Sequence, residues 1–427
     1  MNTGLTFKER FHKCFYVFCR IVITPYFYFV KNYRWKVYTP KSKNYLVLTN
    51  HNTNYDFFLF GMSFRKHMYY VASEAILRAG FGGKCVKALA DPIPRKKGAS
   101  GKEAAIKITE RLKAGFNVCM MVEGNRSFSG KTGWISDTNG TLVKESGAGL
   151  ITYVVHGGYF VNPRWSKHQR SGRMWGEVVH EYTPAEIAGM TAEEVTEIIR
   201  RDVYLNAYDD QKQFNYPYKN KALAENLETA LFFCPECKKA SSLRSKGDHL
   251  FCENCGMDLI LDKYGYFRSS DGKPVPFDTI ADWSDWETGY LKEYLSKFQN
   301  TDNEVRDDPD EGSENDPGEK SGNSSEEKFD RKIFSDEGIS LFEVMPDKSS
   351  RFLVKGEMIL YPDRFVFKNE DTVFEYGVRE IRYFSIFVSD RIMFTDEDRY
   401  YETRSDRPFS ALKYLISWRY LNGKEYR

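Results

Sequence analysis

The sequence has almost no net charge and no apparent internal repeat. Its 427 residues include 62 Lys and Arg against 60 Asp and Glu, which gives a formal net charge of +2. Because the chain carries no strong overall charge of either sign, composition alone identifies no class of partner. Nothing indicates a repeat architecture, and the length instead favours two or three domains.

The sequence also lacks an uninterrupted apolar run of the length that a membrane-spanning helix requires. A span takes about 20 apolar residues, whereas the aromatic run 14–30 carries Arg20 and is broken by Pro25. It lacks the small-residue cleavage site of a secretory signal. Basic residues flank both ends, so residues 1–38 are predicted to lie in the membrane interface as short helices. A helix pair that covers the core and a true membrane anchor are the alternatives.

The first chemical motif follows a short buried strand. The apolar run 45–48 stops at the turn-forming stretch 50–54, which contains His51. A helix is then predicted to start near Asn54, with Asp56 near its first turn. His51 and Asp56 would not share a face of one continuous helix, but a turn at His51 lets the carboxylate reach back to the imidazole. Such a pair fixes the tautomer and leaves the other ring nitrogen basic, as a general base requires. A purely structural His–Asp hydrogen bond is the alternative.

A second apolar run, 118–122, ends in Glu123-Gly124-Asn125-Arg126-Ser127. Together with Asn50-His51 and Asp56, this stretch resembles the glycerolipid acyltransferases of the 1-acyl-glycerol-3-phosphate acyltransferase type. Their His-x-x-x-x-Asp box matches His51 to Asp56. Their Phe-Pro-Glu-Gly-Thr-Arg-Ser box matches the second stretch, with Val122 in place of Pro and Asn125 in place of Thr. The order and spacing of the two boxes also agree.

The resemblance implies an enzyme that moves a fatty acyl group to the free hydroxyl of 1-acyl-glycerol-3-phosphate, giving phosphatidic acid. In that reaction His51, oriented by Asp56, takes the proton of the hydroxyl, and the oxygen attacks the thioester of acyl-CoA or acyl carrier protein. Membrane lipid is therefore an expected partner. The implied substrate contacts come from five residues: Arg95, Glu123, Gly124, Asn125 and Arg126.

Two features of these contacts bear on the acceptor. Arg95 ends the stretch 88–95, which matches the family's second motif as an extended segment, and together with Arg126 it would hold the acceptor's phosphate. The family's Pro-Val-Pro-like fourth motif is missing, since its region keeps only Pro163. Another lysophospholipid acceptor therefore stays open. A non-catalytic lipid-binding zinc-ribbon scaffold is the alternative from a different class.

Strands and helices alternate across residues 39–218. The sequence predicts strands at 69–72, 157–161 and 175–180, a helical turn at 74–77, a helix that begins at 145–151, and helices that begin at capping boxes in 100–103 and 191–194. This order predicts an α/β fold with a largely parallel sheet. Both boxes follow strands, so they are expected at the same edge of the sheet.

Four cysteines form two Cys-x-x-Cys pairs separated by fourteen residues: Cys234, Cys237, Cys252 and Cys255. Four thiolates suit one tetrahedral, structural zinc, so residues 219–270 are predicted to form a zinc ribbon. Disulfides or redox chemistry are the alternative. The other cysteines read as small core residues, which favours a reducing cytoplasm and a protein peripheral on its membrane. The segment between the pairs has few aromatic residues, so no nucleic acid is expected.

The remainder divides at an acidic stretch. Residues 271–300 are predicted to form an amphipathic helix, and residues 301–331, rich in Asp, Glu, Ser, Gly and Asn, a flexible linker. Residues 332–427 show short alternating runs and a closing helix at 409–421. This pattern resembles pleckstrin-homology (PH) or GRAM-like domains, which often bind lipid headgroups or proteins.

Overall fold

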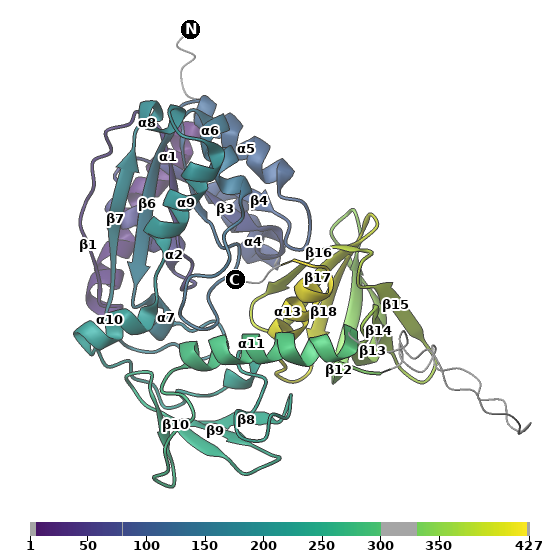
Figure 1. Cartoon of the computed structure of the whole chain (residues 1–427). Coiled ribbons are helices and arrows are strands. Elements are labelled where there is room, and N and C mark those ends of the chain that lie inside the picture. The colour runs from purple at the N-terminus through teal and green to yellow at the C-terminus, as the bar shows by residue number, and fades with distance from the viewer. Residues whose placement is uncertain (1–5, 79, 300–330, 425–427) are drawn as a thin grey trace, which may run out of the picture.

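The computed structural model describes residues 6–78, 80–299 and 331–424. These residues form an N-terminal helical segment, an α/β core, a small four-stranded segment and a C-terminal antiparallel β domain (Figure 1). The long helix α11 (Ile280–Gln299) runs between the last two parts. The linker expected over residues 301–331 lies outside the described residues except for Arg331.

The core is built on one seven-stranded sheet. Its strand order is β1-β7-β6-β2-β5-β3-β4, and every neighbouring pair is parallel except β6 with β7. The predicted α/β fold with a largely parallel sheet is therefore confirmed. The strands are β1 (Tyr33–Trp35), β2 (Tyr45–Thr49), β3 (Met68–Ser73), β4 (Ile93–Arg95), β5 (Asn117–Met121), β6 (Gly149–His156) and β7 (Met174–Tyr182). Strand β1 lies within the segment 1–38.

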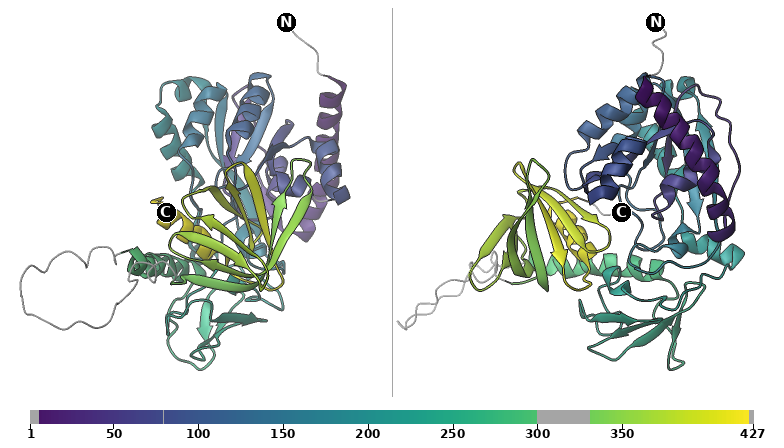
Figure 2. Two further views of the ribbon diagram at one scale, coloured as in Figure 1. Left: turned by 90° about the vertical axis from the view of Figure 1, so that its right-hand side faces the viewer. Right: turned by 180° about the vertical axis from the view of Figure 1, so that it is seen from behind.

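Helices cover both faces of this sheet, and the strand sequences explain why. The side chains of a strand point alternately to the two faces, and in β2 both sets are apolar and buried. Leu46 and Leu48 pack into a cluster with α5 (Lys102–Lys113), α6 (Thr138–Ser146) and α9 (Ala192–Val203). Tyr45 and Val47 pack into the cluster on the other face, where Figure 2 shows α1 (Phe7–Pro25) along the outside. The other core helices are a π-helical turn (Tyr26–Val30), α2 (Asp56–Ser63), α3 (Glu74–Leu77), α4 (Gly80–Ala90), α7 (Gly158–Val161), α8 (Pro184–Ala188) and α10 (Ala207–Phe214).

Two predicted elements around Gly147 are wrong. Residues 145–151 do not begin a helix, because Gly147 takes a left-handed conformation (φ 63°) that ends α6, and β6 then follows. Residues 157–161 are not a strand but the short helix α7. The apolar run that supplies the strand lies a few residues earlier than predicted. Residues 88–90, expected to be extended, complete α4 instead.

The two predicted capping boxes differ in outcome. At α9 the box is confirmed, because Glu194 N donates to Thr191 Oγ1 and Thr191 N donates to the Glu194 carboxylate. At α5 it is wrong. The N-cap is Gly101, and Ser100 Oγ accepts only from Lys102 N at 3.3 Å.

The four-stranded segment comprises β8 (Leu243–Lys246), β9 (His249–Cys252), β10 (Asp258–Leu261) and β11 (Phe267–Ser269), after a 3₁₀ turn (Leu227–Thr229). Helix α11 holds it from one side. The buried carboxylate of Glu287 accepts from Phe232 N at 2.9 Å and from Phe233 N at 3.3 Å. Trp283 Nε1 donates to Phe233 O at 3.1 Å. The helix predicted over 271–300 therefore packs by aromatic and polar contacts with the preceding segment.

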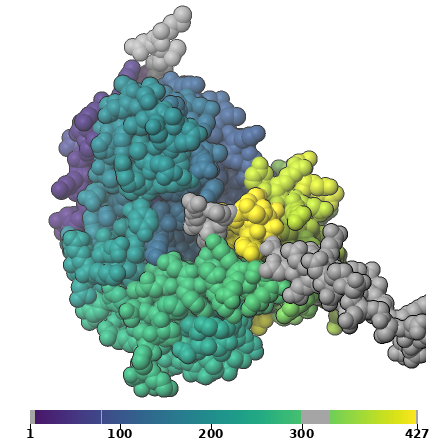
Figure 3. All heavy atoms as spheres, viewed as in Figure 1, coloured from purple at the N-terminus to yellow at the C-terminus, as the bar shows by residue number. Residues whose placement is uncertain are grey.

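The C-terminal domain is a seven-stranded antiparallel sheet with the order β15-β14-β13-β12-β18-β17-β16. Its strands are β12 (Phe334–Val344), β13 (Ser350–Leu360), β14 (Arg364–Lys368), β15 (Val373–Gly377), β16 (Ile381–Phe387), β17 (Arg391–Asp396) and β18 (Arg399–Ser405). The closing helix α13 (Ala411–Leu421) matches the prediction, whereas β18 was not predicted. Figure 3 shows this domain packed directly against the core and the segment that carries α11.

Candidate active site

His51 and Asp56 form a hydrogen-bonded pair just beyond the carboxyl end of β2. Asp56 Oδ2 lies 2.7 Å from His51 Nδ1 and also accepts from Asn52 N at 3.1 Å and Thr53 N at 3.3 Å. Asp56 is fully buried, whereas the His51 side chain is 20% exposed. Because the carboxylate occupies Nδ1, the tautomer is fixed and Nε2 is left to act as a base towards the cavity that His51 lines.

The two motif loops are joined to each other by their backbones. Parallel pairing of β2 with β5 continues as Val122 N donates to Thr49 O at 3.1 Å, and Ser127 N donates to His51 O at 3.0 Å. Glu123 completes the junction, since its two carboxylate oxygens accept from His51 N and from Gly133 N, each at 2.6 Å. The prediction that the loops converge is therefore met by the geometry. Glu123, expected to face the substrate, is engaged with backbone donors.

Burial shifts the pKa values of His51 and Glu123, one in each motif loop. Loss of solvent lowers the pKa of His51, nearby Arg126 and Lys97 lower it further, and the bond to Asp56 opposes this shift. The imidazole is thus favoured in its neutral, basic form. Burial raises the pKa of Glu123 to about 8, against the two backbone donors that favour the carboxylate. Gly124 has φ 66° with open space around its Cβ position, so the loop needs glycine there for conformation alone.

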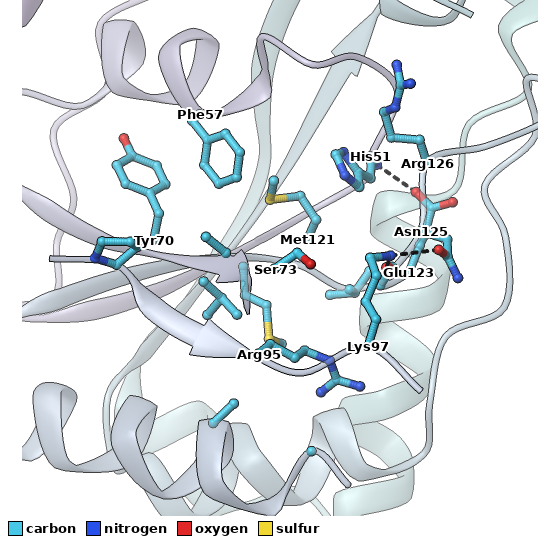
Figure 4. A pocket seen from close by; sticks show the side chains of 18 of the residues that line it. His51, Phe57, Tyr70, Ser73, Arg95, Lys97, Met121, Glu123, Asn125 and Arg126 are labelled. Atoms are coloured by element: carbon cyan, nitrogen blue, oxygen red, sulfur yellow. Dashed lines mark hydrogen bonds between the residues drawn. The ribbon is translucent and has the colours of Figure 1, made fainter. Parts of the chain in front are cut away.

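The predicted cations do not meet at one point. Arg126 Nη1 donates to Asn162 O at 3.1 Å and to Asn162 Oδ1 at 2.9 Å, and burial lowers its pKa to about 10. Figure 4 shows its guanidinium and that of Arg95 projecting to opposite sides of the site, with Lys97 between them in this view. Both arginines line the same cavity. The arrangement therefore does not favour one phosphate bound by both Arg95 and Arg126.

Two cations that the sequence analysis did not select, Lys97 and Arg164, lie at the second loop. Asn125, expected to bind substrate, uses its Oδ1 to accept from Lys97 Nζ at 2.7 Å and from Arg164 Nη2 at 3.2 Å. Lys97 Nζ also donates to Gly124 O at 2.5 Å. Neither cation stands in a recognisable motif. In the sequence, only the run of basic residues around Lys97 indicates a cationic site, and nothing but its position next to Pro163 distinguishes Arg164 from other arginines.

A cavity of about 1970 Å³ joins these residues and changes character along its length. One part is lined by apolar and aromatic side chains of α1, α2 and β3, including Phe15, Ile23, Phe57 and Tyr70. Near the loop 123–127 it is lined by the cations Arg95, Lys97, Arg126 and Arg164, and His51 also lies on its wall. Its volume exceeds the range of ~300–1,000 Å³ typical of small-molecule pockets, and an apolar part beside a cationic part suits an amphiphile.

Comparison with known proteins gives two findings. Residues 32–161 match the sequence profile of the family described as Acyltransferase. The chain contains an acyltransferase domain. Among solved structures, the 1-acyl-sn-glycerophosphate (LPA) acyltransferase PlsC from Thermotoga maritima is similar at 20% identity, with a TM-score of 0.35, over 44% of this chain and 76% of that one. No curated protein matches.

The acyltransferase match covers both motif loops but leaves part of the site outside it. His51, Asp56 and the loop 123–127 fall within residues 32–161, whereas Arg164 and the cavity wall supplied by the C-terminal domain do not. The cavity that His51 lines is thus completed by segments outside the match.

The four cysteines of the predicted ribbon lie together, away from the acyltransferase cavity. Their Sγ atoms all lie within 4.8 Å of one another, with Cys234 to Cys255 at 3.6 Å and Cys237 to Cys252 at 3.7 Å. Tetrahedral zinc with Zn–S bonds of about 2.3 Å places sulfurs about 3.8 Å apart, so the donor set and spacing fit zinc. Gly256 takes φ 75°, which closes the second knuckle.

Proposed function

We propose that the protein is a membrane-associated acyltransferase that moves a fatty acyl group from a thioester donor to the free hydroxyl of 1-acyl-glycerol-3-phosphate. The observation that carries this proposal is the His51–Asp56 pair on the wall of a cavity that is apolar at one part and cationic at another. The acyltransferase domain supplies the chemistry class, and the phosphate of the acceptor suits the cationic part.

The reaction then proceeds by general-base catalysis. His51 Nε2 removes the hydroxyl proton while the acceptor oxygen forms a bond to the thioester carbonyl carbon. Collapse of the tetrahedral intermediate breaks the carbon–sulfur bond, and the leaving thiolate takes the proton from the imidazolium. Asp56 holds the imidazole and stabilises its charged form. Glu123 fixes the two loops to each other, and Arg126 is placed beside the imidazole to bind the acceptor's phosphate.

The direct test is acyl transfer by the purified full chain in detergent or vesicles. The donors are an acyl-CoA and an acyl carrier protein thioester, and the acceptors are lysophosphatidic acid and lysolipids with choline, ethanolamine or glycerol headgroups. We expect lysophosphatidic acid to give the highest kcat/KM, because Arg126 is placed to meet a monoester phosphate. Preference for a larger headgroup would instead support another lysophospholipid acceptor. No transfer to any acceptor would contradict the proposal.

Activity should depend on pH through His51. Only the neutral imidazole takes a proton, and the pKa of His51 lies below its ordinary value of about 6.5. Over roughly pH 5 to 7, kcat/KM should rise with pH and reach its plateau early, with a midpoint below 6.5. Arg126→Met removes a cation that lowers this pKa, so the midpoint should move to higher pH. Arg268→Met, which changes an exposed arginine of the four-stranded segment, should leave the midpoint in place. A midpoint unmoved by Arg126→Met would contradict this account.

The N-terminal helices support membrane association. The stretch Phe7–Val30 is long and apolar enough to cross a membrane by length and composition, and only 11% of its most apolar window is buried. Its polar groups turn to the core, where Tyr16 OH donates to Gly61 O and Arg20 Nη2 to Met62 O. Outward-facing Phe18, Ile21 and Phe29 are 60%, 69% and 79% exposed. We propose a cytoplasmic protein held peripherally on a membrane by this face.

Replacement of this face should release the protein from lipid. The variant Phe18→Ser, Ile21→Ser, Val22→Ser and Phe29→Ser should lower partitioning onto phospholipid vesicles by ~10²-fold or more, because each buried apolar side chain contributes ~1.5–3 kcal/mol. Sedimentation with vesicles measures it.

The matched control changes exposed apolar residues elsewhere, Ile106→Ser and Val373→Ser, which are 59% and 57% exposed. It should bind vesicles as the unchanged protein does. Equal binding by both variants would show that the N-terminal face is not the contact.

Two accessory roles complete the proposal. The four clustered cysteines hold one structural zinc in a ribbon, which the closed four-sulfur set supports. In the C-terminal domain the first strand pairs with the last and one helix closes the sheet, an arrangement that supports a PH- or GRAM-like domain. Such a domain suits an enzyme that works at a lipid surface.

A further inference from the structure

One buried arginine, Arg164, connects the second motif loop with the C-terminal domain. The residue is only 4% exposed. Its Nη1 donates to Arg126 O at 2.9 Å, and its Nη2 donates to Asn125 Oδ1 at 3.2 Å and to Ile386 O at 3.0 Å. Its Nε donates to Val388 O. One guanidinium thus holds two residues of the loop and two residues at the end of the β16–β17 hairpin.

Lys97 makes a second connection between the same two places. Its Nζ donates to Gly124 O and Asn125 Oδ1, and it reaches Ile386 O at 3.4 Å. Figure 4 shows Lys97 and Asn125 facing each other beside Glu123. Two cations from different segments therefore converge on one short loop and on one strand end of the C-terminal domain.

The backbone next to Lys97 is also docked on the C-terminal domain. Tyr400 OH donates to Lys97 O at 2.6 Å, and Thr395 Oγ1 donates to Gly98 O at 2.5 Å. The approach is close, since a Cβ on Gly98 would lie 2.4 Å from Met393 O. Any side chain at this position would therefore force the hairpin away from the core.

The hairpin itself belongs to the substrate cavity. Tyr383, Phe384, Phe387 and Val388 line the same cavity as His51. Val388 has φ 57°, a left-handed conformation that β-branched residues rarely adopt. Such a conformation persists only where the surroundings hold it, and here Arg164 binds its carbonyl.

We propose that Arg164 is a positioning residue for acyl transfer, which together with Lys97 makes the position of the loop 124–126 depend on docking of the β16–β17 hairpin. The C-terminal domain is then part of the catalytic unit rather than only a separate binding module. When the hairpin is docked, the loop is held from both sides and Arg126 is fixed beside the imidazole. When it is undocked, the loop keeps its bonds to β2 but loses this support, and the acceptor's phosphate is held less well.

The kinetic test uses variants on both sides of the interface. It rests on the proposed function, because its readout is acyl transfer to lysophosphatidic acid. Arg164→Met, and separately Thr395→Ala with Tyr400→Phe, should each raise the KM for the acceptor and lower kcat/KM by about tenfold, the effect expected for one or two lost hydrogen bonds. Thr395 and Tyr400 do not line the cavity that contains His51. Arg164→Lys should recover part of the loss.

Two comparisons separate positioning from a general loss of stability. Thr372→Ala with Tyr361→Phe also removes one threonine and one tyrosine hydroxyl, but on the β13–β15 side of the domain, which lies away from the core (Figure 1). This control should change kcat/KM less than about twofold. Combining Arg164→Met with the Thr395 and Tyr400 changes should cost less than the product of the separate losses, because both act through one docked state. Full multiplicative losses would overturn the proposal.

Hydrogen exchange measured on the full chain decides the coupling without any assay of activity. In the Thr395→Ala and Tyr400→Phe variant, and more strongly in Gly98→Val, exchange should accelerate in residues 381–396 and also in residues 123–128. Acceleration in 381–396 alone would overturn the proposal, as would unchanged exchange in both segments of Gly98→Val. If the unchanged protein transfers no acyl group while exchange in the two segments is coupled, the proposed function fails and the coupling stands.

Discussion

Replacing His51 by alanine should lower kcat/KM for acyl transfer by about 10³-fold, within the range by which a positioned general base contributes. In the proposed mechanism the His51 side chain is the base. The other described partners of Asp56 Oδ2 are backbone N–H groups, which cannot take the acceptor's proton in its place. Steady-state transfer to lysophosphatidic acid measures the effect. His180→Ala is the matched control, since His180 is an exposed histidine on β7 outside the cavity, and its activity should stay unchanged. Comparable rates for His51→Ala and the unchanged protein would exclude the mechanism.

Asp56→Asn should be nearly as damaging, although it preserves shape. Oδ2 of Asp56 accepts from two backbone N–H groups, Asn52 N and Thr53 N, as well as from His51 Nδ1. In the variant the amide oxygen would take the place of Oδ2, because all three of its partners are donors, and the amide nitrogen would take that of Oδ1, which has no hydrogen-bond partner. The hydrogen bond to His51 would then persist, but the negative charge that stabilises the imidazolium during transfer would be lost. A variant with more than about a tenth of normal kcat/KM would show that the charge of Asp56 contributes little to the reaction.

The parts of this site that follow from local sequence were predictable. A buried strand that stops in turn-forming residues places His51 at a strand end, and the helix that starts at Asp56 returns the carboxylate to it. The same rule places Glu123 after β5, so parallel pairing of β2 with β5 brings the two loops together. The spacing of the cysteines likewise sufficed to predict their cluster.

The parts that depend on distant segments were not predictable. Arg164 donates hydrogen bonds to the carbonyls of Ile386 and Val388, and Lys97 donates one to that of Ile386. These partners lie more than two hundred residues away, and no local pattern marks a lysine or arginine that will bind a backbone carbonyl of another domain. The contacts of Asn125 were not predictable for the same reason. Its side-chain oxygen, expected to bind substrate, accepts hydrogen bonds from these two cations. Periodicity also misplaced the strand after α6, where the left-handed Gly147 rather than the apolar pattern sets the boundary.

The second large effect should come from the cysteine cluster. Substitution of Cys234 and Cys252 by serine should abolish metal binding and unfold the segment around β8–β11. Structural zinc sites bind with ~10–16 kcal/mol, which equals or exceeds the total stability of a typical domain, ~5–15 kcal/mol. The buried Leu243 and Leu250 of the segment's small four-stranded sheet belong to the same core cluster as Cys234 and Cys252, so loss of the metal would also disturb this packing. Metal analysis of the unchanged protein should give one zinc per chain.

Loss of the metal should also be felt beyond the cluster, through α11. Phe232 N and Phe233 N, which precede Cys234, donate to the buried Glu287 carboxylate, and Trp283 binds Phe233 O. Unfolding of the cysteine segment would leave that carboxylate buried without its donors, at a cost of about 1–3 kcal/mol or more. Hydrogen exchange should therefore accelerate in residues 230–262 and in residues 280–298. Cys14→Ser, which changes an exposed cysteine of α1, is the control and should keep both the zinc and the exchange pattern. A cluster variant that keeps its thermal midpoint would contradict a structural role for the cysteines. An unchanged protein that carries no zinc and loses stability on reduction would favour disulfides over the metal.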